Sequence, residues 1–105
     1  MPGGILDQVR AAASKRLLFL PHGIRQMSRP DRMITTAEVE IVVTTGDLVE
    51  DYPEDVRGHS CLLLAFGEEG RPIHVACSPK DDYLAIITAY LPDPARWSPD
   101  FKRRL

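Results

Sequence analysis

Two strand-like segments joined by a short loop constrain the fold of this chain more than any other feature of its sequence. Residues 60–66 are almost wholly apolar, which is typical of a central strand covered on both faces. Residues 71–78 alternate instead, with apolar side chains on one side of the chain and His74 among those on the other. The loop at 67–70 begins and ends with glycine, so both positions can take a positive φ. The sequence therefore predicts an antiparallel hairpin.

Two more segments read as strands of the same sheet. Residues 48–52 form a short apolar and acidic run that Pro53 ends. After a second turn, residues 83–90 form a further predicted strand, with Ile86, Thr88 and Tyr90 on one face. Because successive hairpins connect these segments, we expect a sheet of about four antiparallel strands.

The first third of the chain reads as helical. Residues 5–15 place apolar side chains at helical spacing, with an acidic residue in the first turn and Lys15 in the last. Pro21 is a permitted first residue for a second short helix through Met27, which must end before Pro30. Both helices precede the strands, an order typical of an α+β domain.

The clearest local signal is a capping box that opens a third helix over residues 35–46. Thr35 and Glu38 have the capping-box spacing, and Ile34 and Val39 occupy the positions of a hydrophobic staple. Gly46 is predicted to close the helix in the left-handed conformation. The valines of this segment share one stripe, so Glu38 is expected on the solvent side.

The end of the chain is predicted to add one short element. Trp97 and Phe101 are four residues apart, a spacing that favours a short C-terminal helix anchored on the domain. We therefore expect a single domain over 1–105. Its parts are a helical extension at 1–16, helices plus sheet at 17–92, and a tail at 93–105.

Length and patterning exclude several classes of protein. A chain of 105 residues is long enough to bury a core without disulfide or metal. Its apolar runs fall far short of the roughly 20 residues that a membrane span needs, and the N-terminus lacks the core of a signal peptide. The prediction is a cytoplasmic protein without membrane contact. Cys61 and Cys77 then read as buried free thiols, with a cross-strand disulfide as the alternative.

No motif for a metal or a cofactor is present. The sequence contains no glycine-rich phosphate loop, nucleophile elbow, HExxH or CxxC pattern. The histidines and cysteines are spaced too irregularly for a zinc ribbon or finger. We therefore expect neither a metal nor a cofactor.

His74 is the most informative polar residue, because it is the one ionisable group in the middle of an otherwise small and apolar strand face. A histidine there can titrate near neutrality and serve a site. The competing interpretation is a hydrogen-bonded structural histidine. Thr88 and Tyr90 on the next strand are its expected polar neighbours.

A second candidate group is cationic. His22 and Arg25 are three residues apart and share one side of a helical turn, with Arg29 or Arg32 close in sequence. Arginine offers a planar fork of donors, so the group could clamp a phosphate. The alternative is that these residues form salt bridges to residues 38–55, a segment that contains seven acidic residues and no basic residue.

Several short motifs in order resemble one family. Over about residues 18–104 the chain resembles the domain of unknown function 4258 family, whose members look like relatives of the RelE/ParE and BrnT toxins. The motifs that carry this resemblance are His22 with Arg25 and Met27, Ile34-Thr35 opening a helix to Gly46, Glu50-Asp51-Tyr52-Pro53, Gly70-Arg71-Pro72-Ile73-His74-Val75, and Ile86-Ile87-Thr88-Ala89-Tyr90.

The resemblance implies a toxin that cleaves RNA without metal and pairs with an antitoxin encoded nearby. It implies that His74 or His22 acts as base and acid, that Arg25 holds the phosphate, and that Tyr90 orients or stacks. The net charge of −2 departs from this pattern, because uncompensated acids repel a polyanion. The alternative is a non-catalytic module of the same fold that binds a protein, for instance through a sheet edge.

Overall fold

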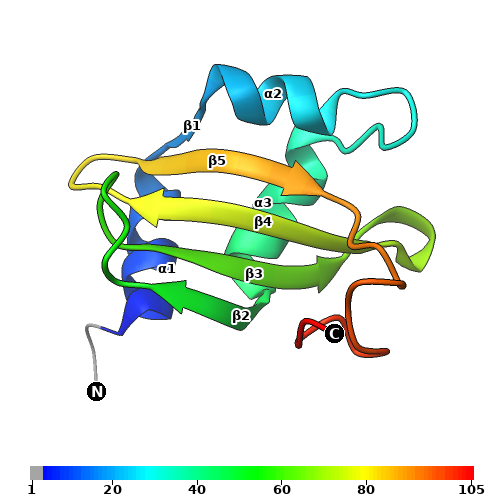
Figure 1. Ribbon diagram of the computed structural model, residues 1–105. Helices are drawn as coiled ribbons and strands as arrows, with labels where there is room; N and C mark the ends of the chain where they lie inside the picture. Colours follow the sequence, from blue (N-terminus) through cyan, green and yellow to red (C-terminus); the bar gives the residue numbers. More distant parts are fainter. Residues whose placement is uncertain (1–3) are drawn as a thin grey trace.

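The computed structural model describes residues 4–105 as helices packed on one mixed sheet (Figure 1). None of the helices in this range is long and apolar enough to cross a membrane. The helices are α1 (Ile5–Lys15), α2 (Pro21–Met27) and α3 (Thr36–Thr45), with a 3-10 turn η1 (Glu68–Gly70). The strands are β1 (Leu17–Phe19), β2 (Asp47–Tyr52), β3 (Ser60–Phe66), β4 (Pro72–Pro79) and β5 (Leu84–Tyr90).

The sheet has five strands in the order β1-β5-β4-β3-β2. The α+β class is confirmed, but the expectation of about four antiparallel strands is wrong. The added strand β1 pairs with β5 in parallel, with Leu17 opposite Leu84. Three residues are too few to show the period-two alternation that reveals a strand, so only the pairing partner identifies β1.

The central hairpin is confirmed. β3 lies between β2 and β4, and its register with β4 places Cys61 opposite Cys77. Both thiols are free and buried, with their sulfurs 4.0 Å apart. In the connecting loop Gly70 takes a positive φ of 72° as expected, but the second positive φ belongs to Glu69 and not to Gly67.

A β-bulge changes which side chains of β5 share a face. Ala76 pairs with Thr88 and Cys77 with Ile86, so the register shifts by one residue between them. Residues opposite each other project to the same side of a sheet. Ile86 therefore lies on the core side with Cys77, and the prediction that it shares a face with Thr88 and Tyr90 is wrong.

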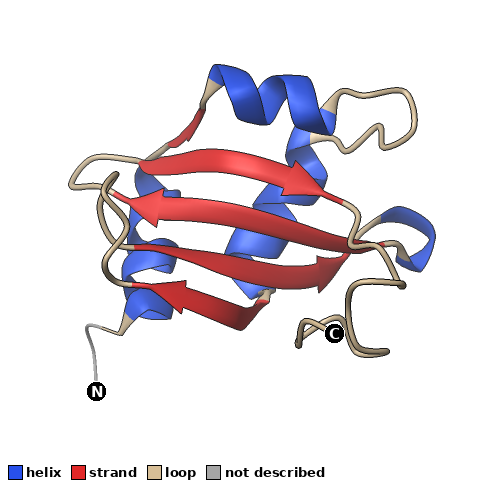
Figure 2. Ribbon diagram, viewed as in Figure 1, coloured by secondary structure: helices blue, strands red, loops and turns tan. Residues whose placement is uncertain are grey.

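The main core lies between the sheet and two helices. α1 and α3 cover the side of the sheet that faces away from the viewer in Figures 1 and 2, and α2 lies along the β5 edge. The predicted bounds of the first two helices are confirmed, and α1 buries Ile5, Val9 and Ala12. Opposite them lie buried apolar residues of the sheet, including Leu63, Ile73, Val75, Leu84 and Ile86.

The capping box of α3 is present, but Glu38 does not face solvent. The Thr35 hydroxyl accepts from the Glu38 amide, and the Glu38 carboxylate accepts from the Thr35 amide, both at 3.0 Å. Glu38 is only 2% exposed, because the same carboxylate also binds the guanidinium of Arg71 at 3.0 Å and the amide of Glu68 at 2.9 Å. The hairpin loop folds back over the start of the helix.

Gly46 ends α3, but not in the left-handed conformation that the sequence suggested. Its φ of −72° and ψ of 163° are extended. A Cβ at this position would lie 2.4 Å from the Val42 carbonyl oxygen and 2.8 Å from that of Leu64. Glycine is required here because the backbones of α3, β2 and β3 approach closely.

The C-terminal segment, residues 93–105, contains no helix, so the predicted short helix around Trp97 and Phe101 is wrong. Pro99 interrupts the segment, since proline disfavours helical geometry at the residue before it. Phe101 has a positive φ of 60°, and Trp97 instead pairs with Arg104 in an isolated bridge. The segment loops in front of the ends of β2 and β3 (Figure 2).

Candidate functional site

His74 and Tyr90 lie side by side on the sheet face opposite α1 and α3. They are directly paired across β4 and β5, and the rings meet edge to face with centroids 5.3 Å apart. The Tyr90 hydroxyl lies 3.2 Å from Nδ1 of His74. Thus the structure brings together two of the four predicted site residues.

The hydrogen bonds of His74 define which nitrogen carries its proton. Nε2 lies 2.8 Å from the carbonyl oxygen of Phe101, which can only accept, so Nε2 is the donor. In the neutral ring Nδ1 then has no proton and accepts from the Tyr90 hydroxyl. The lone pairs of the Tyr90 oxygen remain available to a ligand.

The C-terminal segment covers His74 completely. The residue is 0% exposed, and the Trp97 ring packs edge to face on the imidazole at 4.5 Å. This burial lowers the pKa of His74 below its ordinary value, although the hydrogen bond to Phe101 opposes the shift. His74 is therefore neutral and cannot itself touch a substrate in this arrangement.

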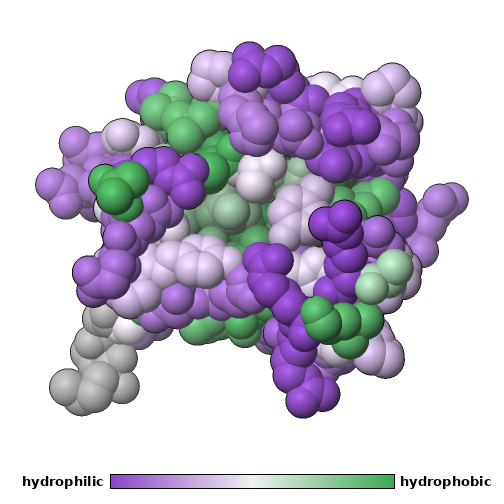
Figure 3. Space-filling model, in the orientation of Figure 1, coloured by the Kyte–Doolittle hydropathy of each residue, from purple (hydrophilic) through white to green (hydrophobic). Residues whose placement is uncertain are grey.

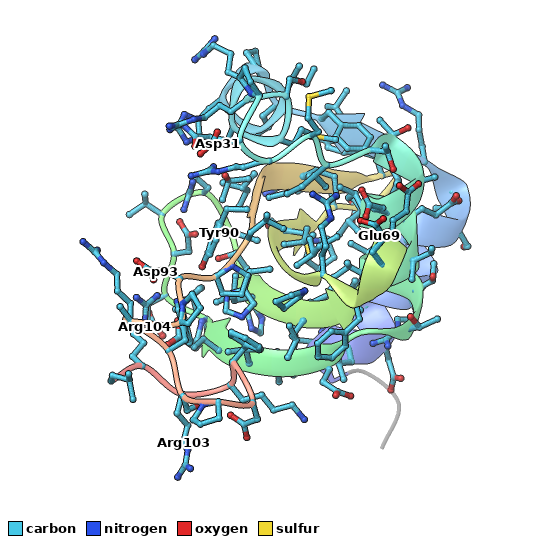
Figure 4. All side chains as sticks on the ribbon, turned by 90° about the vertical axis from the view of Figure 1, so that its right-hand side faces the viewer. Asp31, Glu69, Tyr90, Asp93, Arg103 and Arg104 are labelled. Atoms are coloured by element: carbon cyan, nitrogen blue, oxygen red, sulfur yellow. The ribbon has the colours of Figure 1, made fainter. Side chains whose placement is uncertain are left out.

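Tyr90 is half-buried and opens onto a cavity of about 370 Å³. Figure 4 places Tyr90, Asp93 and Arg104 on the same side of the molecule. Burial raises the pKa of Tyr90, so its hydroxyl stays protonated near neutrality. The residues that line this cavity, named here the arginine pocket, are Arg32, Tyr90, Leu91, Asp93, Arg96, Trp97 and Arg104.

The three arginines of the pocket differ in what holds them. Arg104 makes two hydrogen bonds to the Glu50 carboxylate, at 2.8 and 3.0 Å, and its guanidinium lies 4.7 Å from the centre of the Trp97 ring. This pairing lowers the pKa of Glu50. Arg32 donates to the side-chain oxygen of Gln26 at 2.6 Å. The Arg96 side chain makes no hydrogen bond or ion pair with any residue in the range 4–105.

The other two predicted site residues, His22 and Arg25, are exposed on α2. Within the described part of the chain, no hydrogen bond, ion pair or ring contact joins either of them to His74 or Tyr90. The start of α2 is held to the middle of β5, where the Leu20 amide donates to the Ile86 carbonyl at 3.1 Å. Tyr90 lies four residues further along that strand, about 13 Å away at the usual rise.

Salt bridges from this cationic group to residues 38–55, the alternative to a phosphate clamp, do not form within the described residues. Arg29 pairs instead with Asp31 at 3.4 Å, and Arg32 turns toward the arginine pocket. The acids of that segment pair instead with basic residues later in the chain, for instance Glu38 with Arg71, Asp47 with Lys102 and Glu50 with Arg104.

Sequence reasoning did not identify Arg96, Arg104 and Trp97 as site residues. They belong to a segment without regular secondary structure, so no periodicity relates them to His74 or Tyr90. The only available signal was the combination of a tryptophan with several basic residues after the last strand.

No group of three or more metal-ligating side chains occurs among residues 4–105.

The hollow at the centre of the face shown in Figure 3 is apolar to neutral and is ringed by hydrophilic residues. The chemical groups that the arginine pocket and its wall offer are a hydroxyl, an imidazole, guanidinium groups and the carboxylate of Asp93.

Comparison with known proteins identifies one family. The model of the family described as "Domain of unknown function (DUF4258)" matches residues 19–91, well over half of the chain. The match ends before the C-terminal segment, so the resemblance is shown over a shorter range than the expected 18–104. No curated protein and no solved structure matches the chain. The chain belongs to the domain of unknown function 4258 family.

Proposed function

We propose that this domain is a metal-independent RNA endonuclease, the toxin of a toxin–antitoxin pair, in which Tyr90 meets the RNA and His74 acts through it. The observation that carries the proposal is the hydrogen bond from the Tyr90 hydroxyl to Nδ1 of His74 at the wall of the arginine pocket. An imidazole that can take the proton of a hydroxyl makes the hydroxyl oxygen a stronger base, so this oxygen can accept a proton from a substrate.

The proposed step moves one proton through the pair. The Tyr90 oxygen accepts the proton of a ribose 2′-hydroxyl while its own proton passes to Nδ1 of His74. The 2′-oxygen forms a bond to phosphorus, the bond to the 5′-oxygen breaks, and that oxygen takes a proton from water. The products are a 2′,3′-cyclic phosphate and a 5′-hydroxyl, and the imidazolium returns its proton to solvent through Tyr90.

The exposed residues His22 and Arg25 have a different place in this proposal. Both are exposed on α2, so they contact the RNA backbone outside the pocket and not at the scissile phosphate. This assignment replaces the direct acid, base and clamp roles that the resemblance implied for them.

Cleavage of a panel of single-stranded RNAs in the presence of a chelator tests the proposal. Tyr90→Phe removes the reacting hydroxyl and is expected to reduce the rate about 100-fold or more. Tyr83→Phe is the matched control, because Tyr83 lies in the turn before β5 and outside the pocket. Inactivity of the wild-type protein on a broad panel, or equal rates for the two variants, would overturn the proposal.

The strand order supports a second candidate function, a protein-binding module. β2 is the last strand of the sheet, so its outer edge has no neighbouring strand among residues 4–105. Such an edge can accept a strand from a partner. Coexpression with the product of the neighbouring gene tests this function, and recovery of only the free protein would contradict it.

A further inference from the structure

Arg96 lies on the wall of the arginine pocket without a partner among the described residues. Its position after β5 is determined by backbone bonds, since its amide donates to the Asp93 carbonyl at 2.9 Å and its carbonyl accepts from the Leu105 amide at 3.0 Å. The guanidinium therefore presents all five of its N–H donors to solvent and to the cavity.

The charge of the pocket is positive even after its internal pairs are counted. The charge of Arg104 is balanced by its ion pair with Glu50. The remaining charged groups of the pocket are the two positive guanidinium groups of Arg32 and Arg96 and the one negative carboxylate of Asp93. One oxygen of Asp93 accepts from the Ala95 amide at 2.9 Å. Arg32 is half-buried and held by Gln26, so it is a preorganised cation, whereas Arg96 is an exposed one.

We infer that the arginine pocket binds a phosphate group, with Arg32 and Arg96 as its ligands. Two guanidinium forks match the tetrahedral oxygens of phosphate, which arginine binds with paired hydrogen bonds. The cavity, about 370 Å³, lies within the range of about 300–1,000 Å³ that small-molecule sites occupy, so a nucleotide-sized ligand fits. The Tyr90 oxygen, whose proton points to His74, accepts from a hydroxyl beside that phosphate.

The site extends beyond the family-matched residues. Arg96 and Arg104 follow residue 91, where the match ends, and only Arg32, Tyr90 and Leu91 of the pocket fall inside it. The phosphate site is thus completed by the C-terminal segment of this chain. The choice of RNA as the source of the phosphate rests on the proposed function, but binding itself needs no cleavage.

Two binding measurements on the full chain separate the sources of phosphate. In one arm inorganic phosphate is titrated by calorimetry, and in the other a fluorescent RNA with every 2′-hydroxyl methylated is titrated by anisotropy. Methylation blocks attack by the 2′-oxygen, so the second arm reports binding even if the proposed cleavage fails. Binding in either arm supports the inference, and the arm that responds identifies a small phosphate or an RNA backbone as the source.

The variants test the location of the site. Arg96→Ala is expected to weaken binding about tenfold or more, and Arg96→Lys to retain part of it, because lysine keeps the charge without the fork. Arg103→Ala is the matched control, since Arg103 belongs to the same segment but points away from Tyr90 and Asp93 in Figure 4. Absence of binding in both arms, or equal weakening by Arg96→Ala and Arg103→Ala, would overturn the inference.

Discussion

At the scale of single residues, Glu38 shows how one side chain joins parts of the chain that are distant in sequence. Its carboxylate receives the Thr35 amide, the Glu68 amide and the Arg71 guanidinium, while Arg71 also reaches the carbonyl oxygens of Arg32 and Met33. Burial alone would raise the pKa of Glu38, but these hydrogen bonds together lower it. The charged form is therefore the one that stabilises the fold.

Glu38→Gln is expected to lower the free energy of unfolding by about 2–3 kcal/mol, because it leaves the Arg71 charge without its buried partner. Since the pKa of Glu38 is lower in the folded chain than its ordinary value of 4.5, this contribution is complete above pH 4.5 and is lost as the pH falls below it. Urea unfolding of the variant and the wild type at pH 7 and at pH 3 measures both effects.

The matched control for this prediction is Glu40→Gln. Glu40 is exposed on the same helix, so its replacement is expected to change the free energy of unfolding by less than about 0.5 kcal/mol. Equal losses for the two variants, or a loss for Glu38→Gln that does not shrink in acid, would contradict the role of the charge.

At the scale of elements, the joint between α3 and β2 depends on close backbone approach. Arg10 of α1 donates hydrogen bonds to the carbonyl oxygens of Thr44 and Gly46, both at 2.9 Å. These bonds give the carbonyl groups at the end of α3 the donors that a left-handed glycine cap would otherwise supply. The last turn of the helix, the start of β2 and the middle of β3 meet at Gly46.

Gly46→Ala is expected to cost about 3 kcal/mol of stability, because its Cβ would lie within 2.8 Å of two backbone oxygens that cannot move independently. Gly4→Ala is the control, since a Cβ at Gly4 meets nothing within 4 Å and its replacement is expected to cost less than about 1 kcal/mol. Chemical denaturation measures both variants. A similar cost at the two glycines would refute the argument from close approach.

At the scale of the whole molecule, the C-terminal segment completes the second side of the sheet. Lys102 pairs with Asp47 at 3.1 Å and Arg104 with Glu50, while Trp97 and the Phe101 carbonyl cover His74. These contacts tie the last residues of the chain to β2 and β4. The segment therefore belongs to the folded domain and forms most of the arginine pocket.

Trp97→Ala is expected to destabilise the domain by about 3 kcal/mol and to raise the pKa of His74 toward its ordinary value of 6.5, because water then reaches the imidazole. In the wild type, His74 resists protonation when folded, so stability is full above pH 6.5 and declines as the pH falls below it. NMR titration of the imidazole and thermal unfolding between pH 5 and pH 8 measure these effects.

Phe19→Ala serves as the control for that variant. Phe19 is also aromatic, but it pairs with Ile86 and packs against the core on the sheet face opposite His74, so its replacement is expected to leave the titration of His74 unchanged. An unaltered His74 titration in Trp97→Ala would show that the tryptophan is not what shields the imidazole.

The sequence by itself determined the features that depend on neighbours along the chain. The alternation of β4, the apolar run of β3, the Thr35 capping box and the bounds of α1 and α2 are all signals within a few residues, and each was confirmed. Glycine at position 46 was also recognised as a helix end, although its conformation was not, because an open turn and a close backbone approach call for the same residue.

Only the tertiary structure decided the features that join distant segments. Residues 17–19 form β1 because they pair with the edge of β5. Glu38 is buried because it forms an ion pair with Arg71. The bulge in β5 places Ile86 on the core side of the sheet. The candidate site depends on the same kind of contact. The pairing of His74 with Tyr90 follows from strand register. Arg32 and Arg96 line one pocket only because the C-terminal segment folds back over the sheet, and no local pattern encodes that path.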